Sequence, residues 1–259
     1  MRIALGIEYD GHHFFGWQAQ ENLPTVQRCV EEVLSKIADA EIKVFCAGRT
    51  DAGVHATGQV IHFETQAKRN LRAWTAGANS YLPHSVAVTW AKEVDDAFHA
   101  RFSALSRRYR YIIYNNSIRP AISALRVTWY QRYLDVEMME EAGQFLLGEL
   151  DFSSFRSAAC ESKTPMRNVH FIKVTRHGHF VVIEIQANAF LHHMVRNIVG
   201  VLMRIGAGLE NPEWARVVLA AKDRRQAAET APATGLYLAQ VNYPDLYGFP
   251  NADKGLLLF

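Results

Sequence analysis

The stretch Gly48-Arg49-Thr50-Asp51-Ala52-Gly53 combines residue types that could catalyse a reaction. Small residues flank the polar trio on both sides, so another chain could approach the backbone closely there. A cation and a carboxylate two residues apart on such a loop could form a reaction centre. A tight turn in which Asp51 hydrogen-bonds its own backbone is the alternative. The stretch alone favours this second, structural interpretation.

A predicted strand over residues 107–114 carries the second group of candidates. Together with Arg101, it places four arginines and three tyrosines in fourteen residues. Arginine forks fit phosphates, and tyrosine rings stack on bases at about 1–3 kcal/mol per stack. A strand with a core face and a solvated basic face is the alternative, and the residues do not decide between the two. The candidate RNA ligands on this segment are Arg101, Arg108, Tyr109 and Arg110.

A helix predicted from Phe190 to Gly206 carries Arg196 among apolar neighbours. A half-buried arginine needs a carboxylate, because an unpaired buried charge costs several kcal/mol. A loop aspartate such as Asp51 is the kind of partner it requires. An arginine that faces solvent at the edge of the helix is at least as common.

The order of the predicted elements gives the fold. In the first half, strands over 2–9, 42–47, 59–64 and 86–94 alternate with helices over 25–38 and 71–81, and Thr25 can cap the first helix. The second half repeats this β-α-β-β-α-β order, with a hairpin about His177-Gly178. We therefore predict an α+β chain of two ferredoxin-like halves, 1–103 and 104–259. They would join into one extended, mainly antiparallel sheet with helices on one side and a basic cleft.

Composition excludes several classes of protein. The three cysteines have no CxxC spacing, which argues against a disulfide framework or a zinc site and suits a reducing cytoplasm. His12-His13 and His192-His193 are adjacent pairs, whose side chains are not expected to face one ion, and the HExxH motif is absent, so no metal site is expected. Walker, GxGxxG and GxSxG motifs are absent. An early acid argues against a signal peptide, and no apolar run is long enough to span a membrane.

The loop motif Gly48 to Ala56 resembles the active-site motif of the TruA family of tRNA pseudouridine synthases. Further segments match the same family, and together they extend the resemblance over nearly the whole chain. These segments are Glu8-Tyr9-Asp10-Gly11, Gly16-Trp17-Gln18, His99-Ala100-Arg101-Phe102-Ser103-Ala104, Arg108-Tyr109-Arg110-Tyr111, Asp151-Phe152-Ser153-Ser154-Phe155, Arg167-Asn168, Met194-Val195-Arg196-Asn197 and Gly235-Leu236-Tyr237-Leu238.

This resemblance implies an isomerase that converts uridine to pseudouridine at positions 38, 39 and 40 of the tRNA anticodon stem-loop. The family uses no metal or cofactor, has the double ferredoxin-like sheet and acts as a homodimer with tRNA lying across both subunits. One departure is Ala19, where many relatives carry a basic residue, so an RNA contact at that position is not expected here.

The resemblance also assigns roles to residues. Asp51 would be the catalytic carboxylate, which either attacks the nucleoside or removes a ribose proton, and Arg196 would be its ion-pair partner. Tyr109 would stack on the uracil and could accept the C5 proton, and Leu236 would close the other side of the base. Arg49 would hold the flipped nucleotide or fill its gap. Arg101, Arg108 and Arg110 would bind the RNA. A non-catalytic RNA-binding or RNA-chaperone module on the same scaffold is the alternative function.

Overall fold

The computed structural model describes residues 1–250 of the chain, which form two compact units. The first unit comprises Met1–Arg107 and the C-terminal segment that begins at Tyr237, and the second comprises Arg108–Leu236. The predicted boundary between residues 103 and 104 lies near Arg107, where the chain passes from the first unit to the second. The return of the chain to the first unit at Tyr237 is a feature that the prediction lacks. Within the described residues, every helix is too short or too polar to cross a membrane.

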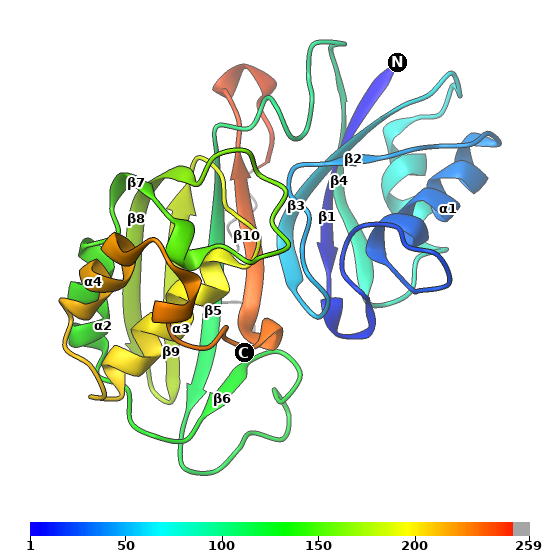
Figure 1. The fold of residues 1–259 in the computed structure, drawn as a ribbon. Helices are drawn as coiled ribbons and strands as arrows, with labels where there is room; N and C mark the ends of the chain where they lie inside the picture. Colours follow the sequence, from blue (N-terminus) through cyan, green and yellow to red (C-terminus); the bar gives the residue numbers. More distant parts are fainter. Residues whose placement is uncertain (251–259) are drawn as a thin grey trace. The chain divides into compact units, whose positions relative to one another are not determined.

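The first unit contains a mainly antiparallel sheet (Figure 1). Strands β4, β1 and β3 are neighbours in that order, and β2 pairs antiparallel with β3. This is the strand order of a ferredoxin-like half. The start of β3 also pairs with β10, in parallel, through Tyr237–His55 and Leu238–Ala56. The strands are β1 (Arg2–Tyr9), β2 (Phe45–Cys46), β3 (His55–Glu64), β4 (Val86–Val94) and β10 (Leu236–Asn242).

Two helical segments pack together beside this sheet (Figure 1). Helix α1 (Val26–Ala38) turns its buried residues Val26, Val30 and Leu34 inward at helical spacing. Its predicted cap is wrong in one respect, because Thr25 occupies the N-cap position but makes no side-chain cap hydrogen bond. The predicted helix at 71–81 is present at 71–79, and its centre, Ala73–Gly77, is wound as a π-helix.

The strands of the second unit follow the order β5-β9-β8-β7, with β6 parallel to β5. Strands β8 and β9 form the predicted antiparallel hairpin, which turns at Gly178 with φ +58°. Strand β7 was not predicted; its residues pair antiparallel with the start of β8. The strands are β5 (Ser106–Asn115), β6 (Thr128–Tyr130), β7 (Gly148–Asp151), β8 (Met166–His177) and β9 (Phe180–Ala187).

Three helices of the second unit pack against one another: α2 (Val136–Gln144), α3 (Met194–Gly206) and α4 (Trp214–Ala221). The prediction that a helix begins at Phe190 is wrong. His193 adopts a left-handed conformation with φ +63°, which an α-helix cannot include, so α3 begins at Met194. Phe190 therefore belongs to the loop before α3 and is not part of the apolar face of that helix.

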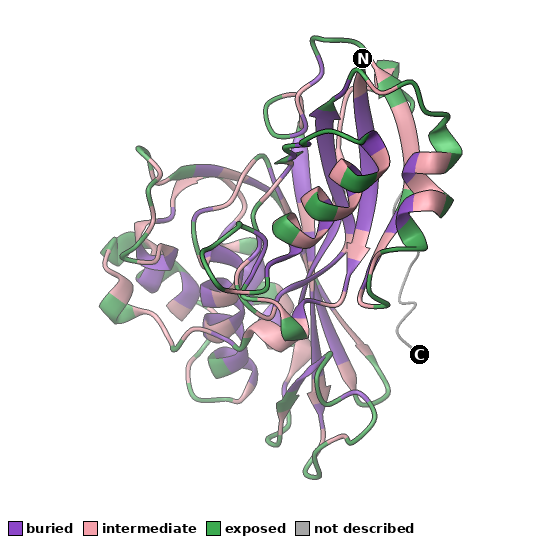
Figure 2. Ribbon diagram, turned by 90° about the vertical axis from the view of Figure 1, so that its right-hand side faces the viewer, coloured by how far each residue is buried: buried purple, intermediate pink, exposed green. Residues whose placement is uncertain are grey.

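Burial is concentrated in the strands and on the inner sides of the helices of each unit (Figure 2). Apolar residues of β1 and β3 lie at the centre of the first unit, and those of β9 and α3 lie at the centre of the second. The predicted fold class, α+β with mainly antiparallel β-structure, is confirmed. Alternating apolar patterns identified the strands, and a 3.6-residue period identified the helices.

Gly200 of α3 provides a test of how the second unit is packed. A Cβ atom there would lie 2.0 Å from the backbone oxygen of Glu229, so Gly200→Ala must displace the main chain. We expect a loss of about 1–3 kcal/mol in the free energy of unfolding, measured by urea titration.

Gly77→Ala is the matched control, because a Cβ there meets nothing closer than 3.8 Å. We expect it to be neutral or to stabilise by up to about 1 kcal/mol. Equal stability of the two variants would show that the segment at Glu229 does not pack as described.

Candidate active site

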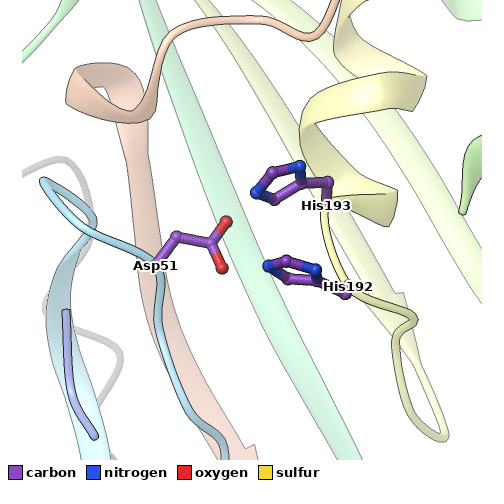
Figure 3. Close-up of side chains that lie close together, drawn as sticks. All are labelled: Asp51, His192 and His193. Carbon is purple, nitrogen blue, oxygen red and sulfur yellow. The ribbon is translucent and has the colours of Figure 1, made fainter. Parts of the chain in front are cut away.

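Asp51 lies on the loop between β2 and β3 of the first unit, with its side chain half-buried (Figure 3). The backbone of the loop turns back on itself, because the Val54 amide donates to the Asp51 carbonyl oxygen at 3.1 Å. Gly53 allows this turn through its φ of +77°. The structural interpretation of the motif, a tight turn, is therefore correct as far as the backbone is concerned. The hydrogen bond that closes this turn uses the Asp51 carbonyl oxygen and not the carboxylate.

A second loop, residues 11–17, is hydrogen-bonded to the Asp51 loop. The Trp17 amide donates to the Thr50 carbonyl oxygen at 3.0 Å, and the Tyr9 hydroxyl bonds the Thr50 hydroxyl at 2.7 Å. The contact is close because Gly16 has no side chain: a Cβ there would lie 2.8 Å from the Thr50 oxygen. Thr50 is thereby held at its carbonyl oxygen and at its hydroxyl, immediately before Asp51.

The other end of the loop is also fixed. The Gln59 side chain donates to the Gly48 carbonyl oxygen at 2.7 Å. The buried guanidinium of Arg107 donates to the carbonyl oxygens of Ala47 at 3.0 Å and Arg101 at 2.6 Å. The backbone on either side of Arg49 is thus held in place, while the Arg49 side chain itself is exposed. An exposed cation on a fixed backbone suits contact with a negatively charged ligand.

Tyr109 is the predicted base-stacking residue of the second unit. It lies on β5, is 9% exposed, and contacts Phe190 in an edge-to-face arrangement with ring centroids 5.0 Å apart. The sequence did not predict this contact of Phe190 with Tyr109, because Phe190 was expected to lie in a helix. The actual loop conformation brings it to Tyr109 instead.

Arg196 lies on the first turn of α3 and is half-buried. Its Nε donates to the Ala231 carbonyl oxygen at 2.7 Å, and the Ala231 amide donates to the Arg196 carbonyl oxygen at 3.2 Å. These two bonds hold both the main chain and the guanidinium of Arg196 against Ala231. The adjacent His192 and His193 precede α3, with their ring centroids 4.0 Å apart (Figure 3).

The next residue, Asn197, is fully buried and ties α3 to two other segments. Its amide nitrogen donates to the Phe155 carbonyl oxygen at 2.7 Å. Its oxygen accepts from Arg224 at 3.1 Å and from the Thr230 hydroxyl at 2.6 Å. Asn197 was quoted in the sequence analysis only as part of a motif. Its buried amide, with each polar atom satisfied, shows a structural role in orienting the helix that carries Arg196.

Leu236, the predicted cover for the base, is buried at the start of β10. The preceding Gly235 lies against β5 and β6 so closely that a Cβ would approach the Ile112 oxygen to 2.6 Å. The Tyr111 hydroxyl reinforces this position by donating to the Pro232 carbonyl oxygen at 2.8 Å. The Gly-Leu pair is therefore a packing requirement as well as a candidate part of the site.

The predicted RNA-binding arginines have different environments. Arg101 is exposed and Arg108 is half-buried. Arg110 forms an ion pair with Glu184, at 2.9 Å from its Nε and 2.5 Å from its Nη2. Any phosphate that binds Arg110 must therefore compete with a carboxylate. Ala19, the exposed position at which many relatives were expected to carry a basic residue, donates its amide to the Gln27 side-chain oxygen at 3.1 Å.

The first unit contains Arg49, Asp51 and Arg101, and the second contains Arg108, Tyr109, Arg110, Arg196 and Leu236. Within the first unit, Tyr9 bonds Thr50, although the sequence assigned Tyr9 no role. Its position at the end of a strand, directly before the Asp10-Gly11 turn, was the signal that could have found it. A strand that ends in a turn is a common support for a neighbouring loop.

Comparison with known proteins identifies the family. The family described as tRNA pseudouridine synthase matches residues 6–103 and 142–244, which is more than half of the chain. The chain belongs to this family. A tRNA pseudouridine synthase A of Legionella pneumophila (strain Lens) is 58% identical over 257 residues, 99% of this chain and 98% of that protein. One of Shewanella sp. (strain MR-4) is 59% identical with the same coverage. The predictions of family and of an isomerase acting on tRNA uridine are confirmed.

A solved structure titled "Crystal Structure of a Cbf5-Nop10-Gar1 Complex" also matches. The match has a TM-score of 0.37 and 13% sequence identity, and it covers 78% of this chain and 45% of that chain.

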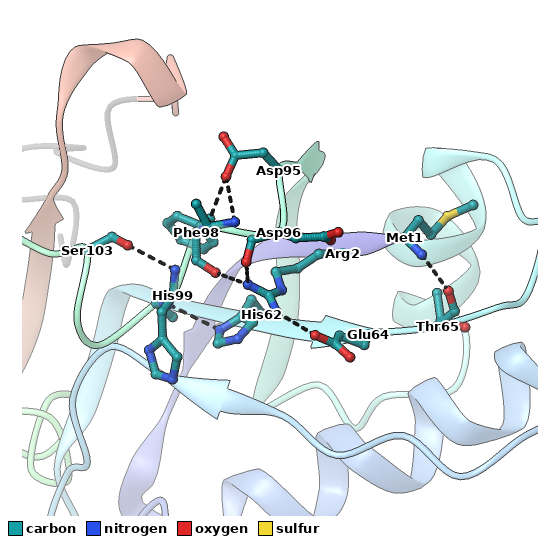
Figure 4. A network of polar contacts seen from close by, with 12 residues as sticks. Met1, Arg2, His62, Glu64, Thr65, Asp95, Asp96, Phe98, His99 and Ser103 are labelled. Atoms are coloured by element: carbon teal, nitrogen blue, oxygen red, sulfur yellow. Dashed lines mark hydrogen bonds and ion pairs between the residues drawn. The ribbon is translucent and has the colours of Figure 1, made fainter.

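A polar network at one end of the first unit controls the protonation of His62 (Figure 4). Burial lowers the pKa of His62 to about 4, and the neighbouring His99 and Arg2 act in the same direction. Its Nδ1 accepts the Ala100 amide at 3.1 Å, which requires that nitrogen to be unprotonated. The folded state therefore keeps His62 neutral, whereas the unfolded chain binds a proton below about pH 6.5.

This difference predicts a pH dependence of stability. Because the folded pKa is depressed, the stabilisation is complete above about pH 6.5 and is lost as the pH falls toward 4. We expect the free energy of unfolding, measured by urea titration, to decrease between pH 7.5 and pH 4.5. In His62→Gln, which cannot titrate, the decrease should be smaller. An identical pH profile in the variant would contradict the assignment.

Proposed function

We propose that this tRNA pseudouridine synthase isomerises the uridines at positions 38, 39 and 40 of the tRNA anticodon stem-loop, with Asp51 as the catalytic carboxylate. The observation that carries the proposal is the Asp51 loop. Its backbone is held by Trp17 and Gln59, and the Thr50 side chain is held by Tyr9. Asp51 itself is half-exposed, in a chain that matches its relatives over 99% of its length. A preorganised charged group is what a site for glycosidic-bond cleavage requires.

Asp51 either attacks the nucleoside or removes a ribose proton after the uridine has left its stack. Tyr109 stacks on the uracil, Leu236 covers the other side of the base, and Arg49 holds the flipped nucleotide or fills its gap. Tyr109 also accepts the C5 proton at the end of the reaction. The exposed position of Arg49 and the fixed backbone around it support its role.

Arg196 forms an ion pair with Asp51 in the working enzyme. Two observations support this role: the bond from its Nε to Ala231 restrains the side chain, and Asn197 anchors the same helical turn. A guanidinium beside the carboxylate keeps it ionised and oriented. Arg101 and Arg108 bind the RNA backbone in a basic cleft, and Arg110 contributes in exchange for its bond to Glu184.

The enzyme acts as a homodimer in the cytoplasm, and its chemistry requires no metal or cofactor. The three cysteines are unpaired, which suits a reducing compartment. The alternative, a non-catalytic RNA-binding or chaperone module, is not favoured, because the full-length relatives are named as synthases. Assays of pseudouridine formation in a tRNA transcript with EDTA present test the absence of a metal requirement.

Replacement of Asp51 by Asn is the primary test of the catalytic assignment. The variant keeps the shape of the side chain but loses its charge and basicity, so we expect turnover to fall by at least about 10²–10⁴-fold. Pseudouridine in an unmodified tRNA transcript is the measurement.

Asp39→Asn is the control, because Asp39 lies at the left-handed end of α1, a conformation that Asn tolerates. It should retain full activity. A folded Asp51→Asn enzyme with unchanged turnover would rule out Asp51 as the catalytic group.

Arg196→Met should reduce activity more than stability. We expect the free energy of unfolding to fall by about 1 kcal/mol, the value of the hydrogen bond to Ala231. Turnover should fall by more than a hundredfold, because Asp51 loses its proposed partner.

Arg204→Met, on the exposed C-terminal turn of the same helix, is the matched control and should leave turnover unchanged. A loss of activity in Arg196→Met no larger than its loss of folded protein would mean that Arg196 is structural.

A further inference from the structure

Four rings form a continuous set on the surface of the first unit: Phe45, His62, His99 and Phe102. Phe45 stacks on His62 with centroids 5.1 Å apart and a 21° interplanar angle. His62 and His99 are 4.6 Å apart, and His99 and Phe102 are 4.4 Å apart. The two phenylalanines at the ends are 52% and 77% exposed. The ring set therefore presents aromatic surface to solvent at both ends.

Hydrogen bonds hold the histidines of the ring set in place (Figure 4). His62 accepts the Ala100 amide at 3.1 Å. His99 Nδ1 accepts the Arg101 amide at 3.1 Å and the Phe102 amide at 3.3 Å, and the His99 amide donates to the Ser103 hydroxyl. The exposed Phe102 is thus attached to a backbone turn that closes on His99. A preorganised exposed ring costs little ordering entropy when a ligand binds.

Positive charge accompanies the ring set. The Arg101 guanidinium lies 5.6 Å from the Phe102 ring centroid. The charges of Arg49 and Arg101 both act on the Cys46 thiol, next to Phe45, where they oppose the burial that raises its pKa to about 12. Residues 97–107, which belong to the first unit, contain two arginines and no aspartate or glutamate.

Two acids near the ring set are already engaged (Figure 4). Glu64 pairs with Arg2, and the Asp95 carboxylate accepts the amides of Ala97 and Phe98 at 2.9 and 3.0 Å. Arg2 also donates to the backbone carbonyl oxygen of Asp96, a contact that does not involve the Asp96 carboxylate. The pKa values of His62 and His99 are lowered, chiefly by burial, so the two imidazoles are neutral at physiological pH. Neutral rings beside free cations match a nucleotide, which offers an aromatic base and a phosphate.

We propose that Phe45, His99 and Phe102 form a stacking surface for an unpaired base of the RNA, with Arg101 on the adjoining phosphate. The stacked nucleotide is not the target uridine. Phe45 is six residues from Asp51, a span of at most about 20 Å of chain, so the nucleotide belongs to the region of the RNA near the target. A paired base cannot use this surface, because its faces are covered by neighbours. The inference rests on the proposed function only in taking tRNA as the ligand.

Phe45→Leu and Phe102→Leu test the proposal, because leucine keeps apolar bulk and removes the ring. We expect each variant to weaken the Kd for a tRNA transcript by about five- to a hundredfold. The dependence of log Kd on log salt should be unchanged, because stacking releases no counterions. Turnover at saturating tRNA should also be unchanged, which separates this inference from the catalytic assignment of Asp51.

Two controls complete the experiment. Arg101→Ala should weaken binding and reduce the salt slope by about one, as expected for a phosphate contact. Tyr81→Leu removes a ring that is 55% exposed on the same unit and packs over Lys36, and it should leave the Kd unchanged.

The proposal is overturned if the double variant Phe45→Leu/Phe102→Leu, shown to be folded by thermal unfolding, binds tRNA as tightly as the unaltered protein. It is also overturned if the double variant changes oligomeric state in light scattering while its Kd for tRNA stays the same. That result would make the ring set a contact between protein subunits.

Discussion

The contact between the loop at residues 11–17 and the Asp51 loop is the constraint on which the candidate site depends. Gly16 allows two backbones to approach within hydrogen-bonding distance, and Trp17 and Tyr9 then fix Thr50 from two directions. The position of the carboxylate is therefore determined by the backbone of a neighbouring loop and needs no long, flexible side chain. This arrangement keeps the orientation of Asp51 independent of the ligand, which is the condition for preorganised electrostatic catalysis.

The same principle of main-chain anchoring applies to the charged residues. The Arg107 guanidinium donates to the carbonyl oxygens of Ala47 and Arg101. It therefore links the start of the Asp51 loop to the segment around Arg101. Arg196 is anchored through Ala231 in the second unit. Arginines that are close in sequence thus have different roles: Arg107 binds backbone carbonyl oxygens, whereas Arg101 exposes its charge to solvent. Buried guanidinium groups can be tolerated because each one satisfies several carbonyl groups.

Much of the architecture could be predicted from the sequence, because it follows from local pattern. A buried apolar run predicted β1, alternation predicted the second half of β3, and the helical stripe of Val26, Val30 and Leu34 predicted α1. The errors lie where the conformation of one residue overrides the pattern. His193 adopts a left-handed backbone that begins α3 four residues later than its apolar stripe suggests. No periodicity reveals such a turn. The short strand β7 was missed because its residues acquire their structure only by pairing with β8. The motif around Asp51 was visible in the sequence, but its support by Tyr9 depends on contacts between distant residues.

The pairing of β10 with β3 has a consequence for the synthesis of the chain. Tyr237 and Leu238 pair with His55 and Ala56, only a few residues after Asp51, and the rings of Tyr237 and His55 stack with centroids 4.6 Å apart. A ribosome delivers residues in order, and N-terminal parts generally fold first. Here the other strands of the first unit, complete by Arg107, must wait for about 130 further residues, roughly six seconds or more of translation at typical rates, before β10 arrives. A nascent chain that stalls in the second unit therefore lacks β10, the strand that pairs with β3 directly after the Asp51 loop. Such an incomplete product would not present a finished candidate site to RNA.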